Sequence, residues 1–79
     1  MGITEEIRSS GKVDASQLVK LFDEVSNNGH VFIVKSDGPR EKTGYTCIIS
    51  LPDEPMNSIR RDGEDLLETV YQVVCEYKF

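Results

Sequence analysis

The side chains best suited to nucleophilic or metal chemistry are few and widely spaced in this sequence. His30 is the only histidine, and Cys47 and Cys75 are the only cysteines. A catalytic triad or a zinc site needs a histidine joined to a nucleophile or to further ligands, and the spacing shows no such set. We therefore predict no catalytic residue, no metal site and no cofactor. His30 is expected to be a surface or edge residue.

The two cysteines are expected to be thiols rather than a disulfide, because Met1 to Ser10 lacks the apolar stretch of an export signal. Cys47 lies among apolar neighbours in an expected strand, which predicts an inert, buried side chain. Cys75 lies toward the edge of the apolar face of an expected helix. We predict that Cys75 is the more accessible thiol.

Four carboxylates near the C-terminal end resemble a cluster for metal or acid–base chemistry: Asp62, Glu64, Asp65 and Glu68. A calcium loop needs alternating oxygen ligands over about twelve residues and a closing glutamate, and this pattern is absent. Acidic residues also favour the positive end of a helix. A charged helix entry therefore accounts for all four.

Basic residues suggest a second kind of chemistry. Arg60 and Arg61 would join Lys35, Arg40 and Lys42 in a small basic patch if a third strand pairs beside an expected hairpin. Such a patch could hold a phosphate or an acidic protein surface. Alternatively, these charges protect strand edges from aggregation.

The overall charge argues against nucleic acid as the main partner. The chain has 79 residues and a net charge of −5, and residues 51–79 contain three basic against seven acidic groups. Binding to a phosphate backbone needs concentrated lysine and arginine. No apolar run approaches the roughly 20 residues of a membrane span. We expect one soluble domain over 1–79, in the cytoplasm and without membrane contact.

Two amphipathic helices are expected to position these side chains. Residues 1–13 are expected to form an arm. Their pattern agrees equally well with a single helical turn capped at Thr4 and with a frayed terminus. Asp14 and Gln17 match a capping box, and Asn28 and Gly29 can end the helix that follows. The residues predicted to face the core from this helix are Ala15, Leu18, Val19, Phe22 and Val25. A second helix opens at residues 62–65, and its apolar face consists of Leu66, Leu67, Val70, Tyr71, Val73, Val74 and Tyr77.

Between the helices the pattern changes to that of strands. Residues 30–36 and 45–51 are rich in β-branched and aromatic side chains and flank a polar loop, which predicts an antiparallel hairpin. Residues 57–60 could add a short third strand. The predicted fold class is α+β, in the order α-β-β-(β)-α, with two helices packed on one face of the hairpin or three-stranded sheet.

Both faces of this sheet are expected to be apolar. Phe32 and Val34 share one face, whereas Val31, Ile33 and Ile48 lie on the other. Because two helices cover only one face, the second face is predicted to bind a protein partner or a second copy of the chain, with Lys35 and Thr46 at its border. Alternatively, the N-terminal arm folds across this face through Ile3 and Ile7.

The C-terminal half resembles small phage and prophage accessory proteins. The resemblance rests on Tyr45 to Ser50 and on Ser58 to Leu67, in which a hairpin strand, an I-R-x-D-G strand end and a D-L-rich helix follow one another. Many such proteins bind and block a host protein, as anti-CRISPR and other anti-defence inhibitors do. The resemblance implies a small inhibitor or regulator in a bacterial cytoplasm, and it implies no functional residue.

These observations together predict a non-enzymatic protein-binding module that inhibits or regulates a larger protein or ribonucleoprotein, with a homodimer as a further possibility. The alternative is a nucleic-acid-associated accessory protein that uses the basic residues of the hairpin. The candidate interface residues are Val31, Ile33, Lys35, Arg40, Lys42, Ile48, Arg60 and Arg61.

Overall fold

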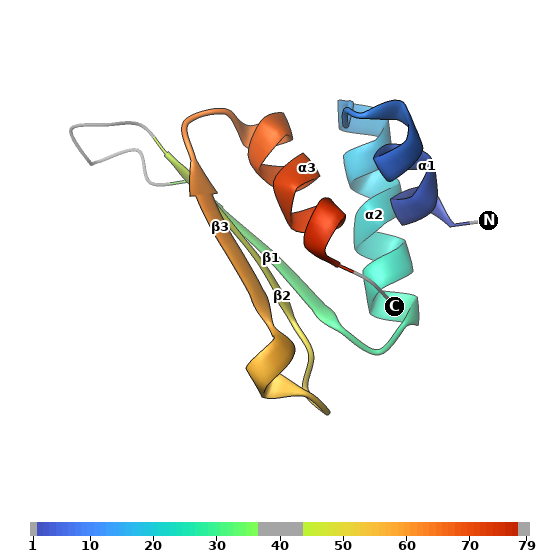
Figure 1. Cartoon of the computed structure of the whole chain (residues 1–79), viewed down its shortest axis with the longest axis vertical. Coiled ribbons are helices and arrows are strands. Elements are labelled where there is room, and N and C mark those ends of the chain that lie inside the picture. Colours follow the sequence, from blue (N-terminus) through green and yellow to red (C-terminus); the bar gives the residue numbers. More distant parts are fainter. Residues whose placement is uncertain (1, 37–43, 78–79) are drawn as a thin grey trace.

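The computed structural model describes residues 2–36 and 44–77, and it has an α+β fold, as predicted. Three helices lie on one side of an antiparallel sheet (Figure 1). The helices are α1 (Ile3–Ser10), α2 (Ala15–Asn27) and α3 (Leu66–Glu76). The strands are β1 (Val31–Ser36), β2 (Tyr45–Ser50) and β3 (Ile59–Gly63), with a short 3-10 helix, η1 (Pro55–Asn57), between β2 and β3.

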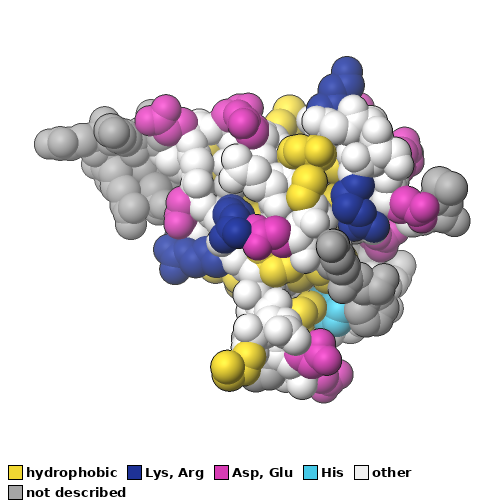
Figure 2. All heavy atoms as spheres, viewed as in Figure 1, with side chains coloured by type: hydrophobic (Ala, Val, Ile, Leu, Met, Phe, Trp, Pro, Cys, Tyr) yellow, Lys and Arg dark blue, Asp and Glu magenta, His cyan; other side chains and the backbone are white. Residues whose placement is uncertain are grey.

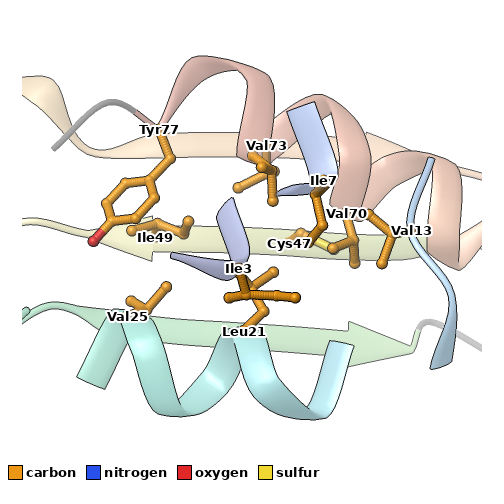
Figure 3. Close-up of a cluster of buried hydrophobic side chains, with 11 residues drawn as sticks. Ile3, Ile7, Val13, Leu21, Val25, Cys47, Ile49, Val70, Val73 and Tyr77 are labelled. Atoms are coloured by element: carbon orange, nitrogen blue, oxygen red, sulfur yellow. The ribbon is translucent and has the colours of Figure 1, made fainter. Parts of the chain in front are cut away.

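The sheet has the order β1-β2-β3, so that β2 is central and the other two strands are edges. Helix α2 packs over β1, while α3 packs over β2 and β3. Their side chains meet those of the sheet in one core. The fully buried members include Leu21, Val25, Cys47, Ile49, Val70, Val73 and Val74 (Figure 3).

The start of α2 confirms the predicted capping box. The Asp14 carboxylate accepts from the Gln17 backbone N–H at 2.8 Å, and the Gln17 side chain accepts from the Asp14 N–H at 3.0 Å. Two orphan donors of the first turn are thereby satisfied. At the other end Gly29 has φ +81°, a conformation that favours glycine, and it directs the chain into β1.

The predicted core stripe of α2 is wrong for Ala15, Val19 and Phe22, all of which are exposed. Val19 is 67% exposed and Phe22 is 40% exposed, whereas Leu21 is fully buried. The helix carries two neighbouring apolar stripes, and periodicity alone does not choose between them. The stripe of Leu18, Leu21 and Val25 faces the core, and Phe22 lies beside it, with its ring 4.5 Å from that of Phe32 on β1.

The start of α3 also differs from the prediction. Asp62 and Gly63 belong to β3, and the helix begins at Leu66 after Asp65, whose side chain makes no capping hydrogen bond. A Cβ at Gly63 would collide with the Thr69 hydroxyl, which donates to the Asp65 carbonyl at 2.7 Å. This close approach explains why β3 can run directly into the first turn of α3.

Residues 1–13 were predicted to be an arm, and most of them form α1. Gly11 ends this helix with φ +79°. Ile7 is fully buried and Ile3 is 9% exposed, and both point into the core between α2 and α3 (Figure 3). The helix therefore completes the helical layer, and it does not fold across the opposite face of the sheet.

Two charged side chains fix the position of α1. The Glu24 carboxylate of α2 accepts from the Ile3 N–H at 2.6 Å, from the Thr4 N–H at 3.1 Å and from the Thr4 hydroxyl at 2.6 Å. At the other end Arg8 donates to the Tyr77 carbonyl at 2.9 Å and to the Val74 carbonyl at 3.4 Å. The predicted cap residue Thr4 thus lies inside the helix, and the cap comes from α2.

No helix in the described part of the chain is long and apolar enough to cross a membrane.

We expect Leu21→Ala to destabilise the protein by about 2–5 kcal/mol, because it opens a cavity in the core. Phe22→Ala removes a half-exposed ring and its stacking on Phe32, and we expect a loss of about 1–2 kcal/mol. Urea unfolding of both variants measures the difference. If Phe22→Ala proves the more damaging change, the assignment of the two stripes is wrong.

The Glu24 cap should make the stability of the fold depend on pH. Burial raises the pKa of this carboxyl, but hydrogen bonds from Thr4 and Ile3 and the charge of Arg8 outweigh burial, so that the pKa lies below its ordinary value. A lowered folded-state pKa contributes stability that is present above the unfolded pKa and is lost as the pH falls through the folded one.

Glu24→Ala should therefore cost about 1–3 kcal/mol at neutral pH. It should cost less at about pH 3, because below the ordinary pKa of glutamate the unfolded chain takes up a proton and the stabilisation by the charged cap declines. Asp23→Ala, a change to the exposed neighbouring carboxylate, is the matched control and should cost little at either pH. Urea unfolding of both variants at the two pH values measures this. An equal loss for Glu24→Ala at both would contradict the charged cap.

Candidate functional site

Most of the predicted interface residues lie on the face of the sheet that points away from the helices. The strand register places Ile33 opposite Ile48 and Ile48 opposite Arg60, forming one row across all three strands. A second row runs from Lys35 through Thr46 to Asp62, and Val31 pairs with Ser50. We call these eight residues the open face.

The centre of the open face is apolar and accessible to solvent. Val31 is 47% exposed and Ile33 is 41% exposed, although both occupy a strand of the sheet. Ile48 beside them on β2 is half-buried. Since α1 packs on the other side of the sheet, it does not shield these side chains. Exposed aliphatic groups that adjoin one another are unusual on a small domain and are typical of interaction sites.

The border of the open face is polar. Lys35 is exposed at one end of β1, and Arg60 lies beside Asp62 on β3 with 3.7 Å between Arg60 Nε and Asp62 Oδ2. This pair is largely exposed, so that it contributes little to stability. Thr46 was predicted to be open to water, but it is buried and donates from its hydroxyl to Asp62 at 2.5 Å.

Of the five basic residues, the three that the structure describes, Lys35, Arg60 and Arg61, do not form one patch. Arg60 points to the open face, whereas Arg61 lies on the helical side, paired with Glu76 of α3. Arg40 and Lys42 fall outside the described residues. On the face seen in Figure 2, lysine and arginine side chains are scattered among aspartates and glutamates. The described cations therefore form no continuous basic surface there.

His30 belongs to a polar cluster that joins the ends of the two long helices. Its Nδ1 lies 2.7 Å from the Tyr77 hydroxyl, and Asn28 donates to the same hydroxyl at 3.0 Å. The histidine ring stands edge-on to that of Tyr77, which is almost fully buried. Burial raises the pKa of the Tyr77 phenol above its ordinary value. The arrangement ties the end of α2 to the end of α3.

The four carboxylates of the C-terminal half do not form a metal site. Asp62 bonds to Thr46 on the open face, while Glu64 and Asp65 lie in the connection to α3. No group of three histidine, cysteine, aspartate or glutamate side chains within residues 2–36 and 44–77 is arranged to hold a metal ion.

One hollow, with a volume of about 430 Å³, lies between η1, β3 and the end of α3. Of its charged lining residues, Arg61 and Glu76 bond to each other. All buried side-chain nitrogen and oxygen atoms of the described residues have hydrogen-bond partners. The hollow therefore presents no unpaired buried group to a small ligand.

Comparison of the chain with protein-family models, with curated proteins and with solved structures finds no match.

The two thiols should differ in reactivity. Cys47 is fully buried, and burial, followed by the charge of Asp62, raises its pKa to about 11. Cys75 is partly accessible. Because the thiolate is the reactive form, a thiol reagent at about pH 8 should label Cys75 first and Cys47 only on unfolding. Mass spectrometry of the labelled peptides, with and without denaturant, measures the order. Rapid labelling of Cys47 in the folded protein would contradict its burial.

Proposed function

We propose that this chain is a non-enzymatic protein-binding module that holds a larger protein or ribonucleoprotein through the open face. The observation that carries the proposal is the exposure of Val31 and Ile33 on a sheet whose three helices all lie on the other side. Interfaces combine such an apolar centre with a polar border, and a few central side chains supply most of the affinity.

The border indicates the chemistry of the partner. Lys35 and Arg60 outnumber the single carboxylate of Asp62 on the open face, although the whole chain has a net charge of −5. A complementary surface would present an apolar patch with acidic groups around it. The chain's acidic remainder would repel such a partner everywhere else, which favours docking in one orientation.

The resemblance of residues 45–50 and 58–67 to phage accessory proteins is the reason for proposing inhibition or regulation rather than binding alone. A bacterial cytoplasm is the matching location. The scattered basic residues favour a protein surface over nucleic acid as the contact. The two differ in salt dependence, because phosphate binding weakens steeply as salt rises.

The test is capture of a partner from bacterial lysate by the intact protein, compared with two variants. Ile33→Asp places a charge in the centre of the open face and should abolish capture. Met56→Asp makes the same kind of change at a side chain that is 95% exposed on η1, away from the sheet, and should leave capture intact. Circular dichroism should show native helix in both, because neither side chain faces the helices.

Two results would overturn the proposal. Undiminished capture by Ile33→Asp would place the partner elsewhere on the molecule. Capture that nuclease treatment abolishes, and that falls steeply between low and moderate salt, would support the nucleic-acid alternative instead.

A further inference from the structure

The two edges of the sheet differ in how they are protected. The β3 edge carries three consecutive charged residues, Arg60, Arg61 and Asp62. The β1 edge begins with four consecutive apolar residues, Val31 to Val34, before its only charge at Lys35. Among the described residues, β1 pairs with β2 alone, so that half of its backbone groups have no strand beside them. Natural edge strands normally carry charge, proline or a bulge against pairing. On β1 this protection is limited to Lys35 near the end of the strand, and Val31 to Val34 have none.

Helix α2 carries an exposed, uncharged stripe on the same side of the molecule. Ala15, Val19, Phe22 and Ser26 are all exposed and uncharged, and they follow one another at intervals of four, three and four residues. This is the spacing of a helix–helix seam. Phe22 stacks on Phe32 of β1, so that the stripe lies above the open edge of that strand. The apolar part of the β1 edge, Val31 to Val34, and the helical stripe thus form one continuous side without charge.

We propose that this uncharged side binds a second copy of the chain. In the dimer β1 pairs antiparallel with the partner's β1 around a twofold axis perpendicular to the sheet. Such an axis keeps both helical layers on the same side of a continuous six-stranded sheet, and it brings α2 against the partner's α2. Antiparallel pairing of one strand with its own copy is self-complementary, as a twofold interface requires.

Three features favour a second copy over an extended peptide. A single added strand would pair with β1 but would bring no helix to cover Val19. The six residues of β1 and the thirteen of α2 each span roughly 20 Å. In the dimer, the contact between the two β1 strands and the contact between the two α2 helices can therefore extend over the same length. The stripe and the apolar part of β1 contain no carboxylate, so that two chains with a net charge of −5 can approach here without direct repulsion.

This interface is separate from the one proposed for the protein partner. The side chains of the open face project from the sheet, while the dimer uses the strand edge and the helical side. Dimerisation would place two open faces next to each other on one surface.

The test combines sedimentation of the intact protein, from micromolar to near-millimolar concentration, with hydrogen exchange at both ends of that range. We expect a monomer–dimer equilibrium. The outward-facing amides of β1 should exchange more slowly as the concentration rises. The amides on the outer edge of β3 are the internal control and should exchange equally at every concentration.

Val19→Glu should weaken the dimer by roughly tenfold or more, as loss of a central interface side chain does. Glutamate is a good helix former and position 19 is exposed, so that the variant should remain folded. Gln72→Glu adds the same charge at an exposed site on α3 and should leave the dimer unchanged.

A protein that stays monomeric throughout would overturn the proposal, as would a dimer whose β1 amides exchange as fast as those of β3. Val19→Glu leaves the open face intact and should still capture the protein partner. If Ile33→Asp loses capture and Val19→Glu keeps it, the open face binds the partner independently of dimerisation. The two proposals can therefore fail separately.

Discussion

The arrangement of the helical layer depends on the hydrogen bonds that the Glu24 carboxylate of α2 accepts from α1. This carboxylate accepts two backbone N–H groups and the Thr4 hydroxyl at the start of α1, where the helix would otherwise have unsatisfied donors and no side-chain cap. Gly2 lies so close to this carboxylate that a Cβ there would collide with it. The contact determines which way α1 runs across α2, and hence where Ile3 and Ile7 enter the core. Arg8 then joins the same helix to the carbonyls at the end of α3.

Local signals in the sequence account for most of the fold. The capping box at Asp14 and Gln17, the stop at Gly29 and the apolar face of α3 were all predicted, because each depends on residues within one or two helical turns. The alternation in β1 and β2 also predicted which side chains face the helices. These features follow from short-range stereochemistry, which a single sequence records directly.

The errors arose where long-range contacts decide the outcome. No pattern shows that Glu24 will cap a helix 20 residues earlier, and α1 was therefore read as a turn or a frayed arm. The choice between the two stripes of α2 depends on the position of α3 and the sheet, which periodicity does not contain. For the candidate site, alternation placed Val31, Ile33 and Ile48 on one face. Arg60 and Arg61 were grouped in one patch because the sequence did not establish a strand over both residues. Within a strand, neighbouring side chains point to opposite faces of the sheet, and this separates the two arginines.

The contact between Arg8 and the end of α3 joins residues 66 and 69 positions apart in the chain. Such a contact closes nearly the whole chain into one loop. During folding, the entropy lost on closing this loop precedes the favourable packing of the core that compensates for it. During synthesis the first two helices emerge long before α3 exists to complete their packing. The core therefore forms only after α3 has been made, and until then the apolar side chains of α1 and α2 have no native partner on that side.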